Sequence, residues 1–126
     1  MPHLTIDYSS QLSGVLDREA LLGELHPLIL EETGSTGVCK TFLRASEAYV
    51  GDDANAAEIF VHAEVGLVPG RHEALKAQLS ESILALLARH LPPEIAARAF
   101  LSAEVRELAP SYRLSPTAAA RQPVRA

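Results

Sequence analysis

Few residues in this chain stand at spacings that would support known chemistry. His62 and Glu64 form the H-x-E pair used by zinc deaminases, but the P-C-x-x-C segment that completes that site is absent. The sequence also lacks a G-x-S-x-G nucleophile elbow and a phosphate-binding glycine loop. The five histidines show no ligand spacing on any one element. We therefore expect no metal site, and we interpret His62 as a strand residue that faces solvent or a neighbouring subunit.

Cysteine and carboxylate chemistry is also poorly supported. Cys39 lies in a short apolar run where nothing would favour a thiolate, so core packing explains it better than nucleophilic attack. Because it is the single cysteine, it cannot form a disulfide within the chain. Asp52 and Asp53 lie in a polar segment, and we interpret them as solvated turn residues.

The remaining candidate is the start of the chain. Removal of Met1, which a small following residue favours, would leave Pro2 with a free secondary amine. Such an amine is a base near neutral pH only when it is unprotonated, and both desolvation and nearby cations lower its pKa. Many proteins begin with Met-Pro without catalytic meaning, so the dipeptide alone supports the hypothesis only weakly.

The first half of the chain predicts a β-α-β unit that would position Pro2. Residues 3–9 alternate between apolar and polar side chains, as in a half-buried strand. Asp17 is a plausible N-cap for a helix with leucines on one face, and Pro27 predicts a kink within that helix. Glycines in 34–37 would end the helix, and 38–45 reads as a second strand.

The second half predicts the same order of elements. Alternation over 59–67 indicates a strand, Pro69-Gly70 a turn, and leucines spaced through 75–87 a helix. Pro92-Pro93 would close this helix or begin a short extra turn, and 100–108 reads as the last strand. A short sequence similarity between the two halves supports the duplication, because Arg18-Glu19-Ala20-Leu21 resembles His72-Glu73-Ala74-Leu75.

Two such units predict an α+β fold. Each helix must join two parallel strands by a right-handed crossover, which gives a four-stranded sheet with both helices on one face. The other face still needs cover, so we expect an oligomer. We predict a single domain over 1–126, with β-α-β repeats at about 2–48 and 56–108 and a C-terminal arm at 109–126 that would order against a neighbour.

Composition limits the partners. The net charge is −5 and no basic run occurs, so nucleic acid is an unexpected partner, whereas scattered cations suit a small anionic substrate. No apolar stretch approaches the roughly 18 residues of a membrane span, and the N-terminus has no secretory pattern. We expect a soluble, cytoplasmic protein that does not bind membranes.

Several short segments together resemble one family, the 5-carboxymethyl-2-hydroxymuconate isomerases of the tautomerase superfamily. Their order and spacing carry the resemblance, which extends to about Leu108. The segments are Met1–His3, Val38–Thr41, Tyr49–Asp52, Phe60–His62 and Gly70–Arg71.

The resemblance implies a homotrimer of duplicated β-α-β subunits that uses no cofactor. It implies proton transfer between carbons of an unsaturated 2-hydroxy or 2-oxo acid, in the breakdown of homoprotocatechuate, with Pro2 as the general base. Arg71 would pair with a substrate carboxylate, and Lys40 would lie near the developing oxyanion or a second carboxylate. The family frequently has an arginine at the position of Phe42. Here Arg44, the nearest basic residue on that strand face, would reach the same pocket and bind the substrate in its place.

Alternatives remain open at this stage. Arg71 would also fit a solvated helix start or a salt bridge with Glu73 or Glu94. Another superfamily activity is a rival, such as a phenylpyruvate-type tautomerase, a hydratase or a dehalogenase. A carboxylate beside Pro2 would favour a hydratase. A non-catalytic trimeric binding protein is the rival from another class, and a blocked Pro2 or a pocket without Arg71 would mark it.

Overall fold

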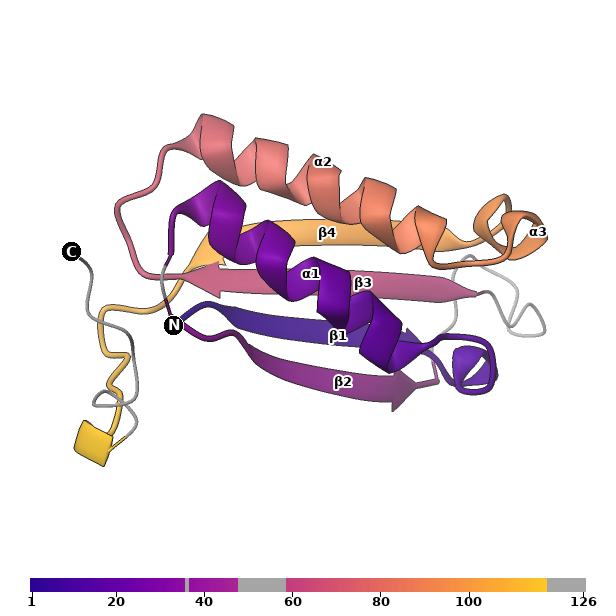
Figure 1. The fold of residues 1–126 in the computed structure, drawn as a ribbon, viewed down its shortest axis with the longest axis horizontal. Helices are drawn as coiled ribbons and strands as arrows, with labels where there is room; N and C mark the ends of the chain where they lie inside the picture. Colours follow the sequence, from indigo (N-terminus) through magenta and orange to yellow (C-terminus); the bar gives the residue numbers. More distant parts are fainter. Residues whose placement is uncertain (36, 48–58, 118–126) are drawn as a thin grey trace.

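A computed structural model describes residues 1–35, 37–47 and 59–117. The Tyr49–Asp52 segment, Asp53 and the last nine residues of the predicted arm lie outside these ranges. The elements in chain order are β1 (His3–Ser9), η1 (Ser10–Leu12), α1 (Arg18–Thr33), β2 (Lys40–Ser46), β3 (Phe60–Leu67), α2 (Glu73–Arg89), α3 (Pro93–Ala96) and β4 (Phe100–Glu107), as labelled in Figure 1.

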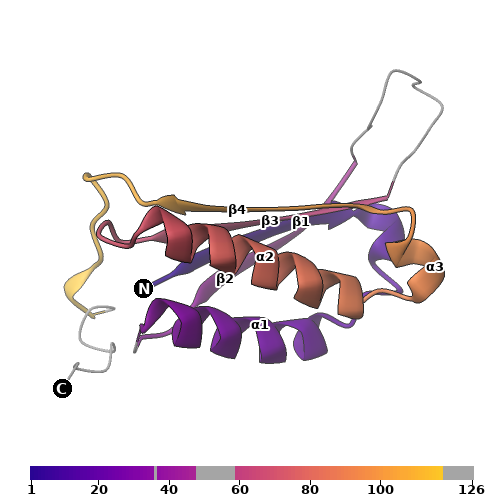
Figure 2. The ribbon, with the colours of Figure 1, turned by 90° about the horizontal axis from the view of Figure 1, so that it is seen from above.

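The four strands form one mixed sheet in the order β2-β1-β3-β4. β1 pairs with β2 and β3 with β4 in parallel, whereas the central strands β1 and β3 are antiparallel. Figure 2 shows α1 and α2 together on one face of the sheet. The predicted α+β fold is thus confirmed. The antiparallel centre adds a consequence that matters for the site, because it places the beginnings of β1 and β3 at opposite ends of the sheet.

The core lies between this sheet and the two helices. The apolar positions of β1 alternate as predicted, and Leu4, Ile6 and Tyr8 are buried against the helices. Burying aliphatic side chains in this layer supplies the main driving force for folding. The helices and β3 contribute the rest of the core, chiefly Leu21, Leu25, Ile29, Val61, Ala63, Val65, Leu79, Ile83, Leu86 and Leu87.

The ends of the helices follow local signals. The Asp17 carboxylate accepts a hydrogen bond from the Ala20 amide at 3.1 Å, which confirms the predicted N-cap. α1 runs as one helix through Pro27 and ends at Gly34, whose φ of 67° is the left-handed conformation that glycine adopts without strain. Lys76 on α2 was not expected in the interior, yet it is buried and pairs with Glu73 at 2.6 Å.

The face of the sheet opposite the helices, which we call the open face, is more polar than we expected. Two cross-strand ion pairs lie on it, Arg44 with Asp7 at 2.9 Å and Arg106 with Glu64 at 2.7 Å. Its apolar residues lie on the edge strands, where Phe42 and Phe100 are about half exposed. The open face therefore combines ion pairs that join each edge strand to a central strand with exposed aromatic rings on both edge strands.

Candidate active site

Pro2 is buried at the beginning of β1. The Lys40 amide donates a hydrogen bond to the Pro2 carbonyl oxygen at 3.0 Å, which extends the parallel β1–β2 ladder to the second residue of the chain. First residues commonly fray because nothing holds them. Here the backbone of the predicted catalytic residue is fixed by the neighbouring strand.

Arg71 lies in the connection between β3 and α2 and reaches across to the end of α1. Its Nη2 donates to the Thr33 carbonyl oxygen at 3.3 Å and to Ser35 Oγ at 3.1 Å, and its Nη1 donates to the Val68 carbonyl oxygen at 3.2 Å. The carbonyl end of a helix favours a cation, so the end of α1 is a suitable support for a guanidinium group. Within the described part of the chain, Arg71 forms no ion pair with Glu73, which is bound to Lys76 instead.

The positive charge of Arg71 affects the pKa of the amino group at the start of the chain. Burial lowers the pKa of the Met1 amino group, and the nearby charge of Arg71 lowers this pKa further, while Cys39 acts weakly in the opposite direction. Both effects disfavour the protonated form of the Met1 amino group, which is the direction that the sequence hypothesis requires for the neighbouring Pro2 nitrogen. Cys39 itself packs against the core, and burial raises the pKa of its thiol, which fits the packing role that we expected for it.

Lys40 approaches the same end of β1 from the open face. It is the cross-strand neighbour of His3, and its side chain is exposed with Nζ 5.4 Å from the centre of the Phe42 ring. Burial lowers the pKa of His3, and the charges of Lys40 and of the amino terminus lower this pKa further. The residues around the start of the chain therefore include Arg71, whose charge acts on the Met1 amino group, and Lys40, whose charge acts on His3.

Arg44 is not brought to this end of the sheet. It lies four residues further along β2, on the same face as Lys40, and its Nε and Nη2 donate to the two carboxylate oxygens of Asp7 at 2.9 and 3.1 Å. These hydrogen bonds to Asp7 raise the pKa of Arg44. Its role in substrate binding stays a prediction, and in this chain its donors face a protein carboxylate.

Comparison with known proteins identifies the family. A profile of the 5-carboxymethyl-2-hydroxymuconate isomerase family matches residues 2–121. The chain belongs to this family. Membership confirms the resemblance inferred from the short segments and makes this chain a member of an isomerase family within the tautomerase superfamily. A search of curated proteins finds no match.

Solved structures agree with this assignment. A 5-carboxymethyl-2-hydroxymuconate isomerase from Deinococcus radiodurans R1 is 27% identical, with 94% of this chain and 92% of that chain covered and a TM-score of 0.76. A 5-carboxymethyl-2-hydroxymuconate delta-isomerase is 24% identical over 91% of this chain and 87% of that chain, with a TM-score of 0.72. A fused 4-OT symmetric trimer is 16% identical over 92% and 95% of the two chains, with a TM-score of 0.69. The last two likenesses show the shared fold alone.

Two features of this family member were missed by reasoning from the sequence. The first is the support of Arg71 by Thr33 and Ser35, which come from the other β-α-β unit. The second is Tyr112, whose hydroxyl oxygen lies 3.1 Å from His3 Nε2 across 109 positions of the chain. No local pattern marks either contact, because each depends on how the two units meet.

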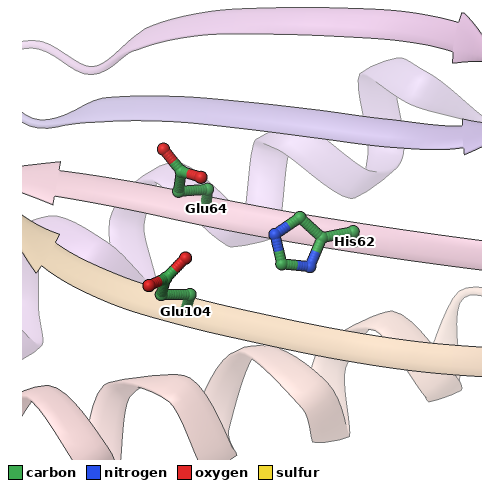
Figure 3. Close-up of side chains that lie close together, drawn as sticks. All are labelled: His62, Glu64 and Glu104. Carbon is green, nitrogen blue, oxygen red and sulfur yellow. The ribbon is translucent and has the colours of Figure 1, made fainter.

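A third group, also unforeseen, lies on the open face. His62, Glu64 and Glu104 place one potential metal ligand each within 4.8 Å of one another, and Figure 3 shows them on the neighbouring strands β3 and β4. Imidazole and carboxylates can bind divalent cations. However, Arg106 already neutralises Glu64 at 2.7 Å, and His62 Nδ1 is 2.7 Å from the Ser102 hydroxyl. A metal would have to displace Arg106, so we assign no metal to this group.

Among the described residues, no helix is both long and apolar enough to cross a membrane.

Proposed function

We propose that this family member moves a proton between carbons of an unsaturated 2-hydroxy- or 2-oxo-carboxylate, with Pro2 as the general base after loss of Met1. The substrate that the family description favours is 5-carboxymethyl-2-hydroxymuconate, and we expect no cofactor. The observation that supports the proposal is the environment of the chain start, where burial and Arg71 both lower the pKa of the Met1 amino group, one residue before Pro2.

The proposed reaction needs one group that both accepts and returns a proton. The neutral Pro2 nitrogen removes a proton from one end of the conjugated system and becomes positively charged. It then delivers the proton to the carbon at the other end. This step restores the neutral amine, and the product is an isomer of the substrate. A lowered amine pKa suits both steps, because the base is free at neutral pH and its conjugate acid gives up the proton readily.

Arg71 is the proposed anchor for a substrate carboxylate. A guanidinium group has five N–H donors, and the three hydrogen bonds described above leave two of them for a ligand. The two remaining donors, Nε–H and one Nη1–H, lie on different edges of the guanidinium plane, so each would make a separate charge-assisted hydrogen bond to the substrate, and such bonds are stronger than neutral ones. The same positive charge would keep Pro2 neutral.

Lys40 is proposed to stabilise negative charge that develops on the substrate oxygen, or to bind a second carboxylate. Its exposed ammonium group stands beside His3 at the start of β2 and is not tied up in any ion pair within the described residues. Preorganised cations aimed at developing charge are a major source of rate enhancement. Lys40 therefore serves better than Arg44, whose donors are bound to Asp7.

The proposed assembly is a homotrimer that covers the open face. The exposed Phe42 and Phe100 rings at the two edges support burial of this face, and the fused 4-OT relative of the same fold is named as a symmetric trimer. A cytoplasmic location and the absence of nucleic acid or membrane partners stay predictions from composition.

The rival activities are less well supported. A hydratase needs a carboxylate beside the amine to activate water. Among the described residues, the side chains that shift the pKa of the Met1 amino group are Arg71 and Cys39, which gives such a carboxylate no support. A non-catalytic binding protein would be marked by a blocked or solvent-exposed Pro2 or by a site without Arg71. The burial of Pro2 and the effect of Arg71 on the pKa of the Met1 amino group support the catalytic proposal over this rival.

The decisive experiment compares two forms of one chain. Protein is expressed with methionine aminopeptidase inhibited, and half of the sample is then treated with the purified aminopeptidase, with intact mass confirming the presence or loss of Met1. Both halves are assayed on a panel of 2-hydroxymuconates and enolpyruvates. We expect turnover only after Met1 is removed, because the Pro2 nitrogen is an amide in the longer form. Equal turnover in both halves would contradict the proposal.

A further inference from the structure

The chain after β4 follows a defined path at the end of the sheet where the N-terminus lies (Figure 1). The Leu108 amide donates to the Leu67 carbonyl oxygen at 2.7 Å, and the Tyr112 amide then closes a turn on the Ala109 carbonyl oxygen at 2.9 Å. Arg113 donates from Nη1 to the carbonyl oxygens of Pro110 and Tyr112, both at 2.9 Å. This segment, residues 108–113, is therefore held by its own hydrogen bonds.

Gly66 gives the segment room to pass close to β1. A Cβ atom at this position would lie 2.7 Å from Leu108 Cδ2, a distance that real Cβ atoms do not adopt, and 3.7 Å from His3 Cβ. Leu108 can thus pack directly on the backbone of β3 beside His3. A side chain at position 66 would require the Leu108 side chain to shift from this place beside His3.

Two contacts hold Tyr112 against His3. The Tyr112 hydroxyl oxygen is 3.1 Å from His3 Nε2, and the two rings meet edge to face with centroids 4.9 Å apart and planes at 79°. Hydrogen bonding and edge-to-face packing are both directional, so together they restrict the rotation of the imidazole. His3 directly follows Pro2 and is the cross-strand partner of Lys40.

We propose that Tyr112 is a positioning residue of the Pro2 site and acts through His3. Its phenol restricts the imidazole of His3, the residue that directly follows Pro2 and pairs with Lys40 across the strands, so that the backbone at the start of β1 is held in one conformation when a substrate binds. The inference rests on the proposed function, because it assumes that the reaction takes place at Pro2. Small displacements of groups that orient a substrate have large effects on rate, which is why a residue outside the reacting centre would matter.

The first test measures the contact itself by NMR and needs no activity. Nitrogen-15 spectra of the imidazole of His3 report which ring nitrogen carries the proton. We expect a single tautomer in the parent protein and a mixture in Tyr112→Phe, which keeps the ring and loses the hydroxyl. Ser111→Ala is the matched control, because Ser111 is exposed and adjacent on the segment. Unchanged His3 spectra in Tyr112→Phe would overturn the inference.

The second test is a double-mutant cycle on kcat/KM. Tyr112→Phe should lower kcat/KM about three- to tenfold, the range expected for loss of one hydrogen bond. In a His3→Ala background the same change should have no further effect, whereas His3→Gln should restore part of the sensitivity, since its amide can replace Nε2. Equal losses in both backgrounds would overturn the inference. If Pro2→Ala were fully active the proposed function would fail instead, and the NMR result would stand independently.

Discussion

The two β-α-β units use the same backbone arrangement at opposite ends of one sheet. In the first unit, the Lys40 amide donates to the Pro2 carbonyl oxygen at 3.0 Å as β2 begins. In the second, the Phe100 amide donates to the Ile59 carbonyl oxygen at 2.8 Å as β4 begins. The backbone arrangement is therefore repeated with different residues. The first unit presents Lys40 and Pro2, whose nitrogen becomes a free amine when Met1 is removed, and the second unit presents two apolar residues, Ile59 and Phe100.

The positions before the two helices differ in the same way. The sequence similarity between residues 18–21 and 72–75 aligns Asp17 with Arg71. The Asp17 side chain caps α1 through the Ala20 amide. The Arg71 side chain instead extends away from α2 and donates hydrogen bonds to Thr33 and Ser35 at the end of α1. Because β1 and β3 are antiparallel, Arg71 of the second unit arrives at the Pro2 end of the first. The duplication thus makes two similar ends and equips only one of them for chemistry.

The largest expected effect is that of replacing Pro2, because the proposed general base is the main chemical difference between the two ends of the sheet. Pro2→Ala should lower kcat/KM by about a hundredfold or more, which is the lower part of the range for loss of general acid–base catalysis. Ile59→Val is the matched change at the opposite end and should leave kcat/KM within about twofold, since it removes one methylene from a buried side chain. Similar losses in both variants would mean that the ends do not differ in chemistry.

The next effect tests the charge that crosses between the units. Arg71→Ala should raise KM by about tenfold or more, because a hydrogen bond to a charged partner is lost. Activity should require the neutral Pro2 amine. Arg71 lowers the pKa of the Met1 amino group, and we expect it to lower the pKa of the Pro2 amine in the same way once Met1 is removed, so activity should be lost as the pH falls through that lowered pKa. Removing Arg71 raises this pKa and should shift the acid limb of kcat/KM to higher pH. Arg89→Ala, an exposed arginine on α2, should change neither quantity.

A smaller effect distinguishes the two cations of β2. Lys40→Ala should lower kcat/KM about two- to fivefold, as expected for an exposed charge that solvent screens. Arg44→Ala should leave kcat/KM nearly unchanged, because its donors are bound to Asp7 in this chain. Steady-state kinetics of the two variants at matched ionic strength provide the measurement. The reverse order would place the second binding charge at Arg44 and require a rearranged Asp7 pair.

The smallest effect concerns stability at the opposite end. Asp17→Ala should lower the free energy of unfolding by about 1 kcal/mol, the typical value for loss of an N-cap, and leave kcat/KM unchanged. Asp17→Asn should retain most of the stability because its amide oxygen can still cap the helix. Urea unfolding at equal protein concentrations measures both variants, since assembly would make stability depend on concentration. A loss of activity in Asp17→Ala would show that this end also supports the reaction.

Local patterns in the sequence account for most of the fold. The alternation in β1, the Asp17 cap and the helix-ending Gly34 were predicted because each depends on residues close in the chain. The antiparallel pairing of β1 with β3 was not, since two β-α-β units can join a sheet in more than one way. The burial of Lys76 was also missed, because a lysine usually stays exposed unless a partner such as Glu73 follows it inward.

The site was less accessible to sequence reasoning. Pro2 and Arg71 could be named from the resemblance, but their proximity depends on the antiparallel centre of the sheet. The contact of Tyr112 with His3 joins the two ends of the described chain, and no spacing rule reaches over 109 positions. The pairing of Glu64 with Glu104 needs the β3–β4 register, which the pattern of alternation alone does not fix.

The hydrogen bond from the Lys40 amide to the Pro2 carbonyl has a further consequence for the mature protein. The terminal residue has its carbonyl group tied to β2 and its nitrogen tied into a five-membered ring, so few torsional states remain open to the amine. A substrate would then meet a reactive group whose orientation is already set, and little conformational entropy would be lost on binding. A proline at this position therefore holds its amine in a restricted orientation, whereas the amine of an acyclic residue would rotate freely.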